Sequence, residues 1–558
     1  MLQYFPLEVA RAKQIKACEY IQHKIDEGFS DIVVAAPTGV GKSAIGVAAA
    51  FWIASRPRPE GVSPGAYYLV TQKLLQDQIT DDIPRYRPCC HNGSSIKTSE
   101  EYPCPDYGDC GTGRRLAMAA GRILKMSPEK LAKMSKDTLA KKTQKCQCLV
   151  DDCCTYKLAK STWLNSTLSV TNYAFFFTSK MYTNDLKPRQ LLICDECHSL
   201  EEQIIRFVDG AISLTQVKKW TSWTSIPDFA NIQEYCTWIE KVYVPKLNDV
   251  YHELEDLEIL ADVGDDKVSK ELVELDKYIC KLNRAVKQLK INQDNWVFWK
   301  EDSKDGEEVQ YVIRPVFGAP FVKEFVTSMA PVRLYLSAYP GISSVFCRNL
   351  GLDPKKVAWA SIGSDFAIER RKVHFYNMGS MGSSSKVKTI PTVLRSIIKI
   401  AKTHENQRGL IHCNSYELGG HIQTALAENG QGGRVIFPKN ADEREAAFKQ
   451  HLDFPNSILI SPSMTEGFDF AGEKARWQVI PKVPYPYLGD KQIARKLELD
   501  EEWYTMRTVM TVIQACGRIC RSSTDHGVTY VLDADFKRLW DKAEWMMPNW
   551  FKDAVVFH

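Results

Sequence analysis

The segment from Ala36 to Ser43 contains the residue types that bind a phosphate group. It consists of Ala36, Pro37, Thr38, Gly39, Val40, Gly41, Lys42 and Ser43. Glycines let backbone N–H groups turn toward an anion, and the helix expected after the loop adds its positive dipole end. Lys42 can then reach the β- and γ-phosphates, and the Ser43 hydroxyl can bind Mg²⁺. Ala36 stands where the usual pattern begins with glycine.

Two adjacent carboxylates follow a second apolar run. The strand expected over residues 190–194 leads into Asp195, Glu196, Cys197 and His198. Asp195 can hold Mg²⁺, and Glu196 can orient or deprotonate an attacking water molecule. His198 is a candidate for sensing the γ-phosphate or for contacting a second domain. A surface turn is the alternative for this tetrapeptide alone, but a phosphate loop earlier in the chain favours the catalytic interpretation.

A third polar group lies near the end of the chain. Gln514, Arg518 and Arg521 are spaced so that a helix would place them on one face. Two guanidinium groups on one face suit a triphosphate bound across a cleft, as an arginine finger does. The alternative is an arginine-rich face exposed to solvent.

The cysteines are numerous and unevenly placed. The chain has 17 of them, an odd number, which does not suit a disulfide framework in a reducing compartment. Eight lie between residues 89 and 154: Cys89, Cys90, Cys104, Cys110, Cys146, Cys148, Cys153 and Cys154. This spacing indicates a metal or cluster site. Residues 111–145 between them are basic, which favours either a solvated helix face or a groove for a polyanion.

Length and composition limit the class of protein. The 558 residues allow three or four domains, at roughly 150 residues each. Apolar content of 44% and charged content of 25% are ordinary for a globular protein, and a net charge of +4 does not by itself identify a nucleic-acid partner. The sequence contains no apolar run long enough to span a membrane, and we expect a cytoplasmic protein.

The pattern of strands and helices predicts an α/β chain with two units. In the first, polar residues end expected strands and can contact nucleic acid: Thr71 and Gln72 at its phosphates, with Thr171 and Asn172 as further candidates. Tyr173, Tyr416 and Tyr485 are candidates for stacking on bases or for wedging a duplex apart, and a place in the core is the alternative for each. An ordinary helix N-cap is the alternative at Thr71. Residues 207–300 show helical periodicity and predict a helical insert. A second unit begins near residue 346, and Asn414 and Tyr416, which follow a strand there, are further candidates for contact with DNA.

In their order along the chain, these motifs resemble those of a superfamily 2 helicase. More narrowly, the chain resembles the XPD/FANCJ/DinG family of iron–sulfur DNA helicases. The narrower match rests on the cysteine-rich insert before Asp195, the helical insert before Leu336-Ser337-Ala338, and the segment Thr465-Glu466-Gly467-Phe468-Asp469-Phe470. The start of the chain, with Phe5-Pro6, Arg11 and Gln14, is similar to the adenine-recognition motif of the family.

The resemblance implies two tandem RecA-like motor domains with ATP and Mg²⁺ between them. It divides the chain into motor domain 1 (1–88, 155–206 and 301–345), an iron–sulfur insert (89–154), a helical arch (207–300) and motor domain 2 (346–558). Gln14 would read adenine, Ser43 and Asp195 would hold Mg²⁺, and Arg518 and Arg521 would be the fingers. Gln514 would act at the γ-phosphate. Gly467 and Asp469 would lie at the ATP and Glu466 at the DNA, and Glu466 and Asp469 would couple the nucleotide state to the grip on DNA.

The family also implies a [4Fe–4S] cluster on four cysteines. We expect Cys104, Cys110, Cys148 and Cys154, with Cys89, Cys90, Cys146 and Cys153 as alternative ligands. Thiolates suit zinc as well as iron–sulfur clusters, so zinc stays open. One departure from the family is Tyr339, where threonine is common after Ser337-Ala338.

The implied activity is ATP-dependent translocation on single-stranded DNA, 5′→3′, with unwinding of duplex. Single-stranded and forked DNA would be the partners, together with replication or repair proteins, and a monomer is expected. The compact chain would suit a bacterial or phage protein. Two other functions remain open: an RNA helicase or protein-displacing translocase, and a non-motor scaffold that binds nucleic acid under control of ATP.

Overall fold

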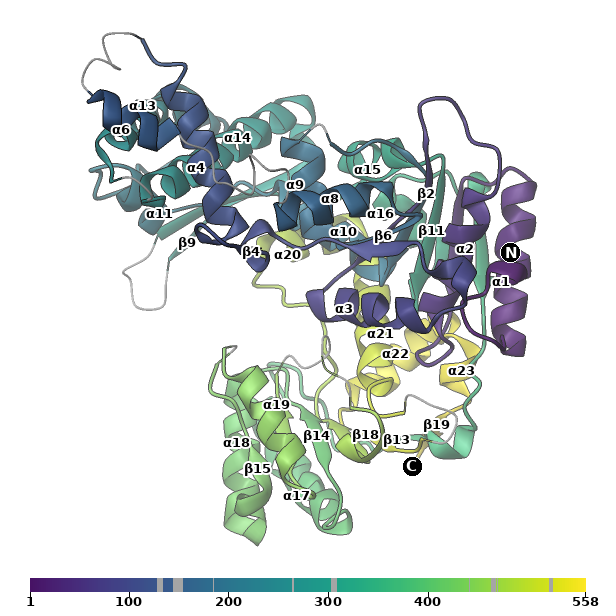
Figure 1. The fold of residues 1–558 in the computed structure, drawn as a ribbon. Helices are drawn as coiled ribbons and strands as arrows, with labels where there is room; N and C mark the ends of the chain where they lie inside the picture. The colour runs from purple at the N-terminus through teal and green to yellow at the C-terminus, as the bar shows by residue number, and fades with distance from the viewer. Residues whose placement is uncertain are drawn as a thin grey trace.

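The computed structural model describes residues 1–127, 134–143, 154–183, 185–262, 265–302, 309–440, 442–462, 468, 470–520 and 525–558. Its two largest sheets have seven strands each, and every strand pair in both is parallel. Figure 1 shows them in two separate α/β bodies. The expectation of two tandem α/β motor domains is confirmed. Within the described ranges, no helix combines the length and apolar character that crossing a bilayer requires.

The first sheet has the order β12-β1-β11-β7-β2-β6-β3. Its strands are β1 (Asp31–Ala35), β2 (Ser63–Val70), β3 (Gly93–Ser95), β6 (Leu168–Asn172), β7 (Arg189–Asp195), β11 (Val332–Ser337) and β12 (Val357–Ser361). One face packs against α1 (Ala12–Asp26), α2 (Lys42–Ala54) and α3 (Lys73–Asp82). The other packs against α8 (Thr155–Asn165), α9 (Tyr173–Tyr182), α10 (Leu200–Val208), α15 (Ala319–Phe325) and α16 (Ser343–Leu350).

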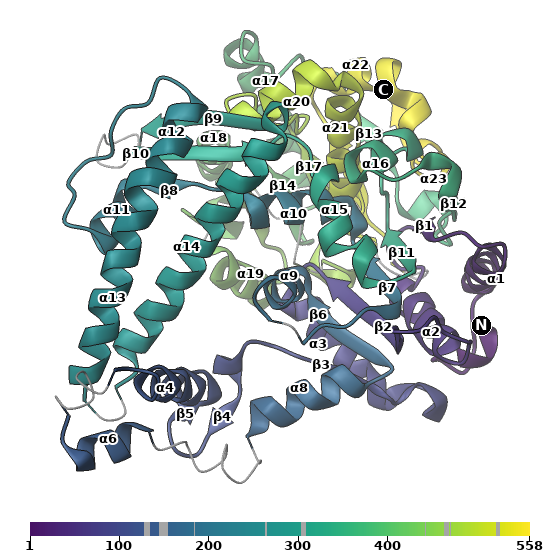
Figure 2. The same ribbon diagram turned by 90° about the horizontal axis from the view of Figure 1, so that it is seen from above.

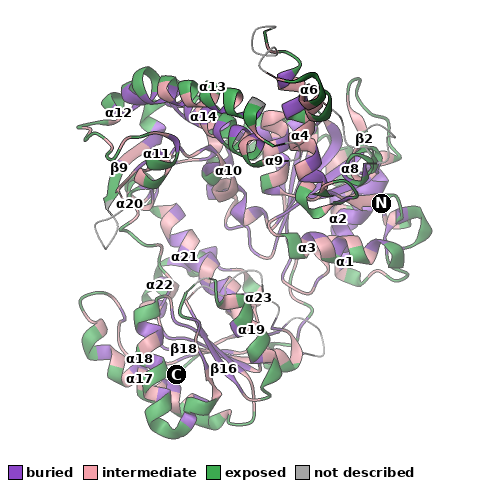
Figure 3. Ribbon diagram, turned by 60° about the vertical axis from the view of Figure 1, so that its left-hand side comes forward, coloured by how far each residue is buried: buried purple, intermediate pink, exposed green. Residues whose placement is uncertain are grey.

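The second sheet has the order β15-β16-β14-β17-β18-β13-β19. Its strands are β13 (Val373–Phe375), β14 (Gly409–His412), β15 (Val435–Ile436), β16 (Ile458–Ser461), β17 (Trp477–Ile480), β18 (Val528–Val531) and β19 (Val555–Phe557). Its helices are α17 (Lys386–Thr403), α18 (Tyr416–Leu426), α19 (Arg444–Asp453), α20 (Lys491–Leu499), α21 (Glu501–Cys516), α22 (Asp535–Ala543) and α23 (Asn549–Lys552). Figure 3 shows β16 and β18 buried between helices whose outer faces are exposed.

Two inserts project from the first motor domain. The cysteine-rich insert contains β4 (Pro103–Cys104), β5 (Gly108–Asp109), α4 (Cys110–Ile123) and α6 (Lys136–Thr143). The helical insert contains α11 (Leu214–Trp220), α12 (Ile232–Trp238), α13 (Val244–Leu260) and α14 (Lys267–Ile291). It also holds an antiparallel sheet of β8 (Ile212–Ser213), β10 (Val309–Pro315) and β9 (Trp296–Asp302). Figure 2 shows α4 and α6 beside one end of α13 and α14.

Three expected domain boundaries differ from the strand pairing. Strand β3 pairs with β6, so the first sheet continues past residue 89. Strands β9 and β10 pair with each other, so the helical insert continues past residue 300 to Pro315. Strand β12 pairs with β1, so motor domain 1 reaches Ser361 rather than ending at 345. Sheet partners distant in the sequence decided each boundary, and a local composition pattern does not reveal them.

Candidate active site between the two motor domains

The phosphate loop leaves β1 at Ala35 and enters α2 at Lys42. Gly39 and Gly41 have positive φ values of 82° and 84°, a conformation that glycine adopts without the clash that a Cβ would cause. The N–H group of Ala36 donates to the carbonyl of Ser337 over 2.9 Å, which holds the start of the loop against β11. The loop thus has the glycine geometry expected of a phosphate cradle.

Helix α1 braces this loop. Arg11 Nη2 donates to the carbonyl oxygens of Gly39 and Val40 over 2.9 and 2.7 Å, and Gln14 Nε2 donates to Val40 O over 2.9 Å. Gln14 Oε1 accepts from the Arg11 N–H group, and the side chain is 2% exposed. A Cβ on Gly41 would lie only 2.5 Å from Gln14 Nε2. The structure therefore places Gln14 as a support of the loop, and its role in reading adenine stays a prediction.

The two carboxylates at the end of β7 face the phosphate loop. Glu196 Oε1 lies 3.7 Å from Lys42 Nζ, and Glu196 has a φ of 48°, which is uncommon for a residue with a side chain. Asp195 is buried, and its Oδ2 accepts a hydrogen bond from the Tyr68 hydroxyl over 3.1 Å. Tyr68 also interacts with the Ser43 side chain. Ser43 and Asp195 therefore share one neighbour, as two ligands of one Mg²⁺ would.

The surroundings of Asp195 and Glu196 shift the pKa values of the two carboxyl groups in opposite directions. Burial, followed by the negative charge of Glu196, raises the pKa of Asp195. Burial also opposes ionisation of Glu196, but Lys42, His198 and Arg518 together hold the pKa of Glu196 well below its usual range. Of the two carboxyl groups, Glu196 is thus the one that ionises first as the pH rises.

His198 connects this strand end to the next one. Its Nδ1 lies 2.8 Å from Ser337 Oγ and 3.3 Å from Glu196 Oε2. Two residues after Ser337, the buried Tyr339 donates its hydroxyl hydrogen to Met546 O of the second motor domain over 2.6 Å. The tyrosine that departs from the family pattern therefore makes a contact between the two domains.

The second motor domain closes over the loop. Helix α21 carries Gln514 in its last turn and is followed by Gly517. A Cβ on Gly517 would lie 3.8 Å from Thr38 Oγ1, and Arg518 acts electrostatically on Glu196. The structure thus brings Gly517 to the phosphate loop and Arg518 near Glu196, and Gln514 lies three residues before Gly517 in α21. The predicted residues Arg521, Glu466, Gly467 and Asp469 lie outside the described residues.

Comparison with known proteins agrees with this arrangement. The family described as Helicase C-terminal domain matches residues 397–554, and the family of the res subunit of type III restriction enzymes matches residues 8–237. An XPD helicase structure superposes with a TM-score of 0.63 at 16% identity, covering 99% of this chain and 100% of that one. The structure of S. tokodaii Xpd4 gives a TM-score of 0.56 at 12% identity, over 98% and 100% of the two chains.

The chain is similar to XPD-like helicases of superfamily 2 in sequence motifs and in fold. A regulator of telomere elongation helicase 1 homolog from Caenorhabditis briggsae is 28% identical over 228 residues, which are 34% of this chain and 22% of the relative. The helicase subunit XPD of general transcription and DNA repair factor IIH from Dictyostelium discoideum is 26% identical over 145 residues, 23% of this chain and 18% of the relative. Each match spans less than a quarter of the relative's length.

Two residues predicted to contact DNA are buried instead. Tyr173 is 1% exposed and donates its hydroxyl hydrogen to Asp195 O over 2.8 Å. Thr171 is fully buried, and its hydroxyl donates to Ile96 O. Both side chains face the protein core from the end of β6, so they cannot contact a strand in this conformation. The prediction for these two side chains is corrected to a structural role.

The other predicted DNA contacts occupy the ends of strands. Thr71 and Gln72 are partly exposed after β2, and Asn172 caps α9 by accepting from the Phe175 N–H group. In the second motor domain, Asn414 has a φ of 60° after β14, and Tyr416 is 39% exposed. Their contact with DNA stays a prediction.

The cysteine-rich insert brings two of the predicted ligands together. The Sγ atoms of Cys110 and Cys154 lie 3.7 Å apart, and Cys104 is buried in the same core cluster. The alternatives Cys89 and Cys90 lie elsewhere, beside the backbone of residues 3 and 4. Cys146, Cys148 and Cys153 lie outside the described residues. Within the part of the chain that the structure describes, no group of three His, Cys, Asp or Glu residues is arranged around a metal position.

Sequence reasoning did not single out Tyr68 as a site residue. It lies in the strand Ala66 to Val70, and its hydroxyl contacts the predicted Mg²⁺ ligand Asp195. Adjacent strand residues point to opposite faces of a sheet, so Tyr67 and Tyr68 must lie on different faces. The sequence does not show which of the two tyrosines faces α2, and the structure shows that it is Tyr68.

Proposed function

We propose that this chain is an ATP-driven helicase that translocates along single-stranded DNA, 5′→3′, and unwinds duplex DNA. The observation that carries the proposal is the meeting of three elements at one site. Lys42 of the phosphate loop lies 3.7 Å from Glu196, and Gly517 of the second motor domain packs near Thr38, which places Arg518 within electrostatic reach of Glu196.

Each side chain has one task in hydrolysis. Lys42 neutralises the β- and γ-phosphates, and Glu196, kept ionised by Lys42 and His198, orients the attacking water. Ser43 and Asp195 would hold Mg²⁺, which supplies charge neutralisation at the phosphate oxygens. Gln514 and Arg518 approach from the opposite domain, so ATP binding would draw the two domains together.

The two inserts support a passage for one strand. Arg122 of α4 donates from Nε and Nη2 to the Glu258 carboxylate of α13 over 2.9 and 2.5 Å. Ser269 of α14 donates to the same carboxylate over 2.6 Å, and Arg115 pairs with Asp266 over 2.7 Å. These contacts join the cysteine-rich insert to the helical insert. We propose that the joined inserts admit a single strand, gripped mainly through its backbone and therefore in a salt-sensitive manner.

We also propose that the cysteine-rich insert holds a [4Fe–4S] cluster. Cys104, Cys110 and Cys154 fit this role because all three thiols are at most 4% exposed and two of them are in contact. Cys148 is the fourth ligand in this proposal. The cluster would serve as a structural staple for the insert, since its ligands come from both ends of the segment.

The motor proposal is tested with Lys42→Ala and Glu196→Gln. Both variants should lose ATP hydrolysis that depends on single-stranded DNA by at least about 100-fold, and both should lose unwinding. Comparing DNA with RNA as the stimulating strand tests the substrate, and duplexes with a 5′ or a 3′ overhang test the polarity. Unwinding that survives in both variants would leave only the scaffold function.

The cluster proposal is tested on protein purified without oxygen. We expect absorption near 400 nm and about four iron atoms per chain, both reduced in Cys110→Ser and Cys154→Ser. Cys280→Ser, at an exposed cysteine of α14, is the matched control and should keep the full iron content. A colourless protein with stoichiometric zinc would assign the same thiols to zinc instead.

A further inference from the structure

Helix α21 connects the interface of the two motor domains to the ATP site. Its C-terminal end carries Gln514 and leads to Arg518, while its N-terminal half and the preceding α20 contact the first motor domain. The closest contact is between Lys496 Nζ and Glu201 Oε1, at 2.6 Å. The Lys496 side chain is 2% exposed and lies over the Trp503 ring, 4.4 Å from its centroid. A lysine buried this deeply requires its carboxylate partner.

Two further ion pairs flank this contact. Arg507 of α21 pairs with Glu202 over 2.8 Å, so the adjacent carboxylates Glu201 and Glu202 of α10 each bind a cation of the second domain. Arg348 of α16 donates from Nε and Nη2 to Asp500 over 2.7 and 2.8 Å. We call the pairs Lys496–Glu201 and Arg507–Glu202 the interdomain clasp.

The helices joined here are continuous with the catalytic motifs. Helix α10 begins two residues after His198, and α16 begins six residues after Ser337. Both helices therefore follow directly on strand ends that line the candidate ATP site. The clasp thus joins α10, which follows Asp195 to His198, to α20 and α21, which precede Arg518.

The helical insert meets the clasp as well. Glu201 Oε1 accepts from the Gly318 N–H group over 3.2 Å, just after β10. Gln492 Nε2 donates to Pro315 O over 3.1 Å, and Arg314 pairs with Asp490 over 3.3 Å. If a bound DNA strand displaced the helical insert, the displacement would thus act directly on α20 and on Glu201.

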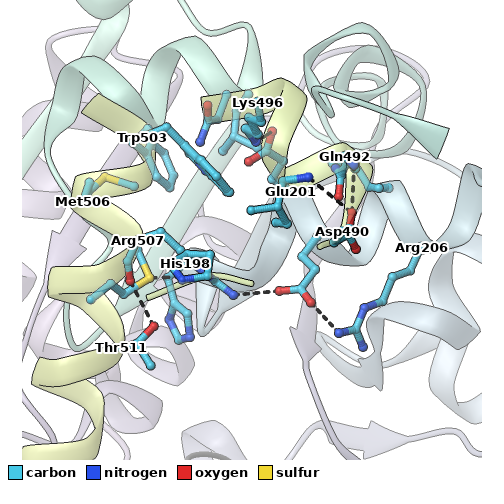
Figure 4. A pocket seen from close by; sticks show the side chains of 18 of the residues that line it. His198, Glu201, Arg206, Asp490, Gln492, Lys496, Trp503, Met506, Arg507 and Thr511 are labelled. Carbon is cyan, nitrogen blue, oxygen red and sulfur yellow. Dashed lines mark hydrogen bonds and ion pairs between the residues drawn. The ribbon is translucent and has the colours of Figure 1, made fainter. Parts of the chain in front are cut away.

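A cavity of about 470 Å³ lies beside the clasp. Figure 4 shows Trp503, Met506, Arg507 and Thr511 of α21 along one wall and Arg206 of α10 on the opposite side. This space lets α21 tilt without a steric clash. The ten residues from Arg507 to Cys516 span about 14 Å, so a tilt of about 10° would move the end of α21 by about 2 Å.

We propose that Lys496 and Glu201 are positioning residues that set the tilt of α21, and that through them a strand bound at the insert brings Gln514 and Arg518 to the γ-phosphate. This inference rests on the proposed helicase function. Neither residue belongs to the phosphate loop or to the segment from Gln514 to Arg518. Loss of the pair should lower the stimulated turnover rate and leave the binding of ATP unchanged.

The test compares Lys496→Met, Glu201→Gln and the double variant in steady-state ATP hydrolysis with single-stranded DNA. We expect the kcat of each single variant to fall at least fivefold while the KM for ATP stays within twofold of the wild type. The double variant should be no slower than the slower single variant, because both substitutions break one contact. Lys496→Arg, which keeps the charge, should recover at least half of the rate.

The matched control is Lys219→Met. Lys219 also pairs with a glutamate, Glu274, but on the exposed surface of the helical insert, and its loss should leave kcat and KM unchanged. Hydrogen exchange of the α21 amides gives a second measurement, and it should quicken in Lys496→Met and not in Lys219→Met.

Three results would overturn the role of the clasp. They are a wild-type kcat in Lys496→Met, losses that multiply in the double variant, and a change confined to KM. If the wild-type protein itself shows no stimulation by single-stranded DNA, the proposed helicase function fails first. If the wild type is stimulated and Lys496→Met is stimulated equally, only the clasp proposal fails.

Discussion

A buried histidine in the second motor domain makes a quantitative prediction about stability and pH. His451 of α19 is fully buried, with Ser457 Oγ 2.8 Å from Nδ1 and Lys474 O 2.7 Å from Nε2. Burial, opposed by the Lys474 carbonyl and assisted by Arg408, lowers the pKa of His451 to about 4. In the unfolded chain the same side chain titrates near about 6.5.

The sign follows from proton uptake. Between about pH 6.5 and pH 4 the unfolded chain binds a proton that the folded chain excludes, so the free energy of unfolding falls as the pH falls through this window. At pH 5 the loss from this one group is about 2 kcal/mol, from the difference between the two pKa values. At pH 7.5 the loss is close to zero, since both states are neutral.

The variant His451→Gln removes the titrating group and isolates its contribution. It should be less stable than the wild type at pH 7.5, and the difference in free energy of unfolding should shrink by about 2 kcal/mol at pH 5. Urea denaturation followed by tryptophan fluorescence at the two pH values measures it. Ser457→Ala keeps the histidine and serves as the control, whose difference from the wild type should not shrink in this way. A difference for His451→Gln that is equal or larger at pH 5 would refute the reasoning.

Three further substitutions test contacts described above. Arg122→Met leaves the Glu258 carboxylate without its guanidinium and should weaken the contact between the inserts by about 3 kcal/mol, seen as faster hydrogen exchange in α4 and a larger loss of unwinding than of ATP hydrolysis. Gly41→Ala forces a side chain into a φ of 84° and against Gln14, and should weaken ATP binding about tenfold or more in a fluorescent-nucleotide titration. Tyr339→Phe removes one hydrogen bond between the domains and should lower the melting temperature slightly, by the equivalent of about 1 kcal/mol, while a larger effect would mean that the hydroxyl does more than hold the domains together.

The sequence alone determined the two α/β units and the motifs of the candidate active site. Lys42, Asp195 and Gln514 each stand in a short local pattern whose chemistry depends on spacing along the chain, and such spacing survives without knowledge of the fold. The structure places these motifs at one interface, with Glu196 3.7 Å from Lys42. Parallel strands present their carboxyl ends at one edge of a sheet, which is why strand-end motifs predicted the site.

Only the tertiary structure revealed the features that depend on contacts between residues distant in the sequence. Tyr173 follows a strand and was predicted to contact DNA, but its hydroxyl bonds to Asp195 O inside the core, and no local pattern shows which way a side chain at that position turns. The domain boundary near 346 was wrong because β12 pairs with β1, more than 300 residues earlier. Lys496 and Glu201 lie 295 residues apart in the sequence. A lysine on a helix is usually exposed to solvent, so the sequence does not predict that Lys496 is buried against a carboxylate.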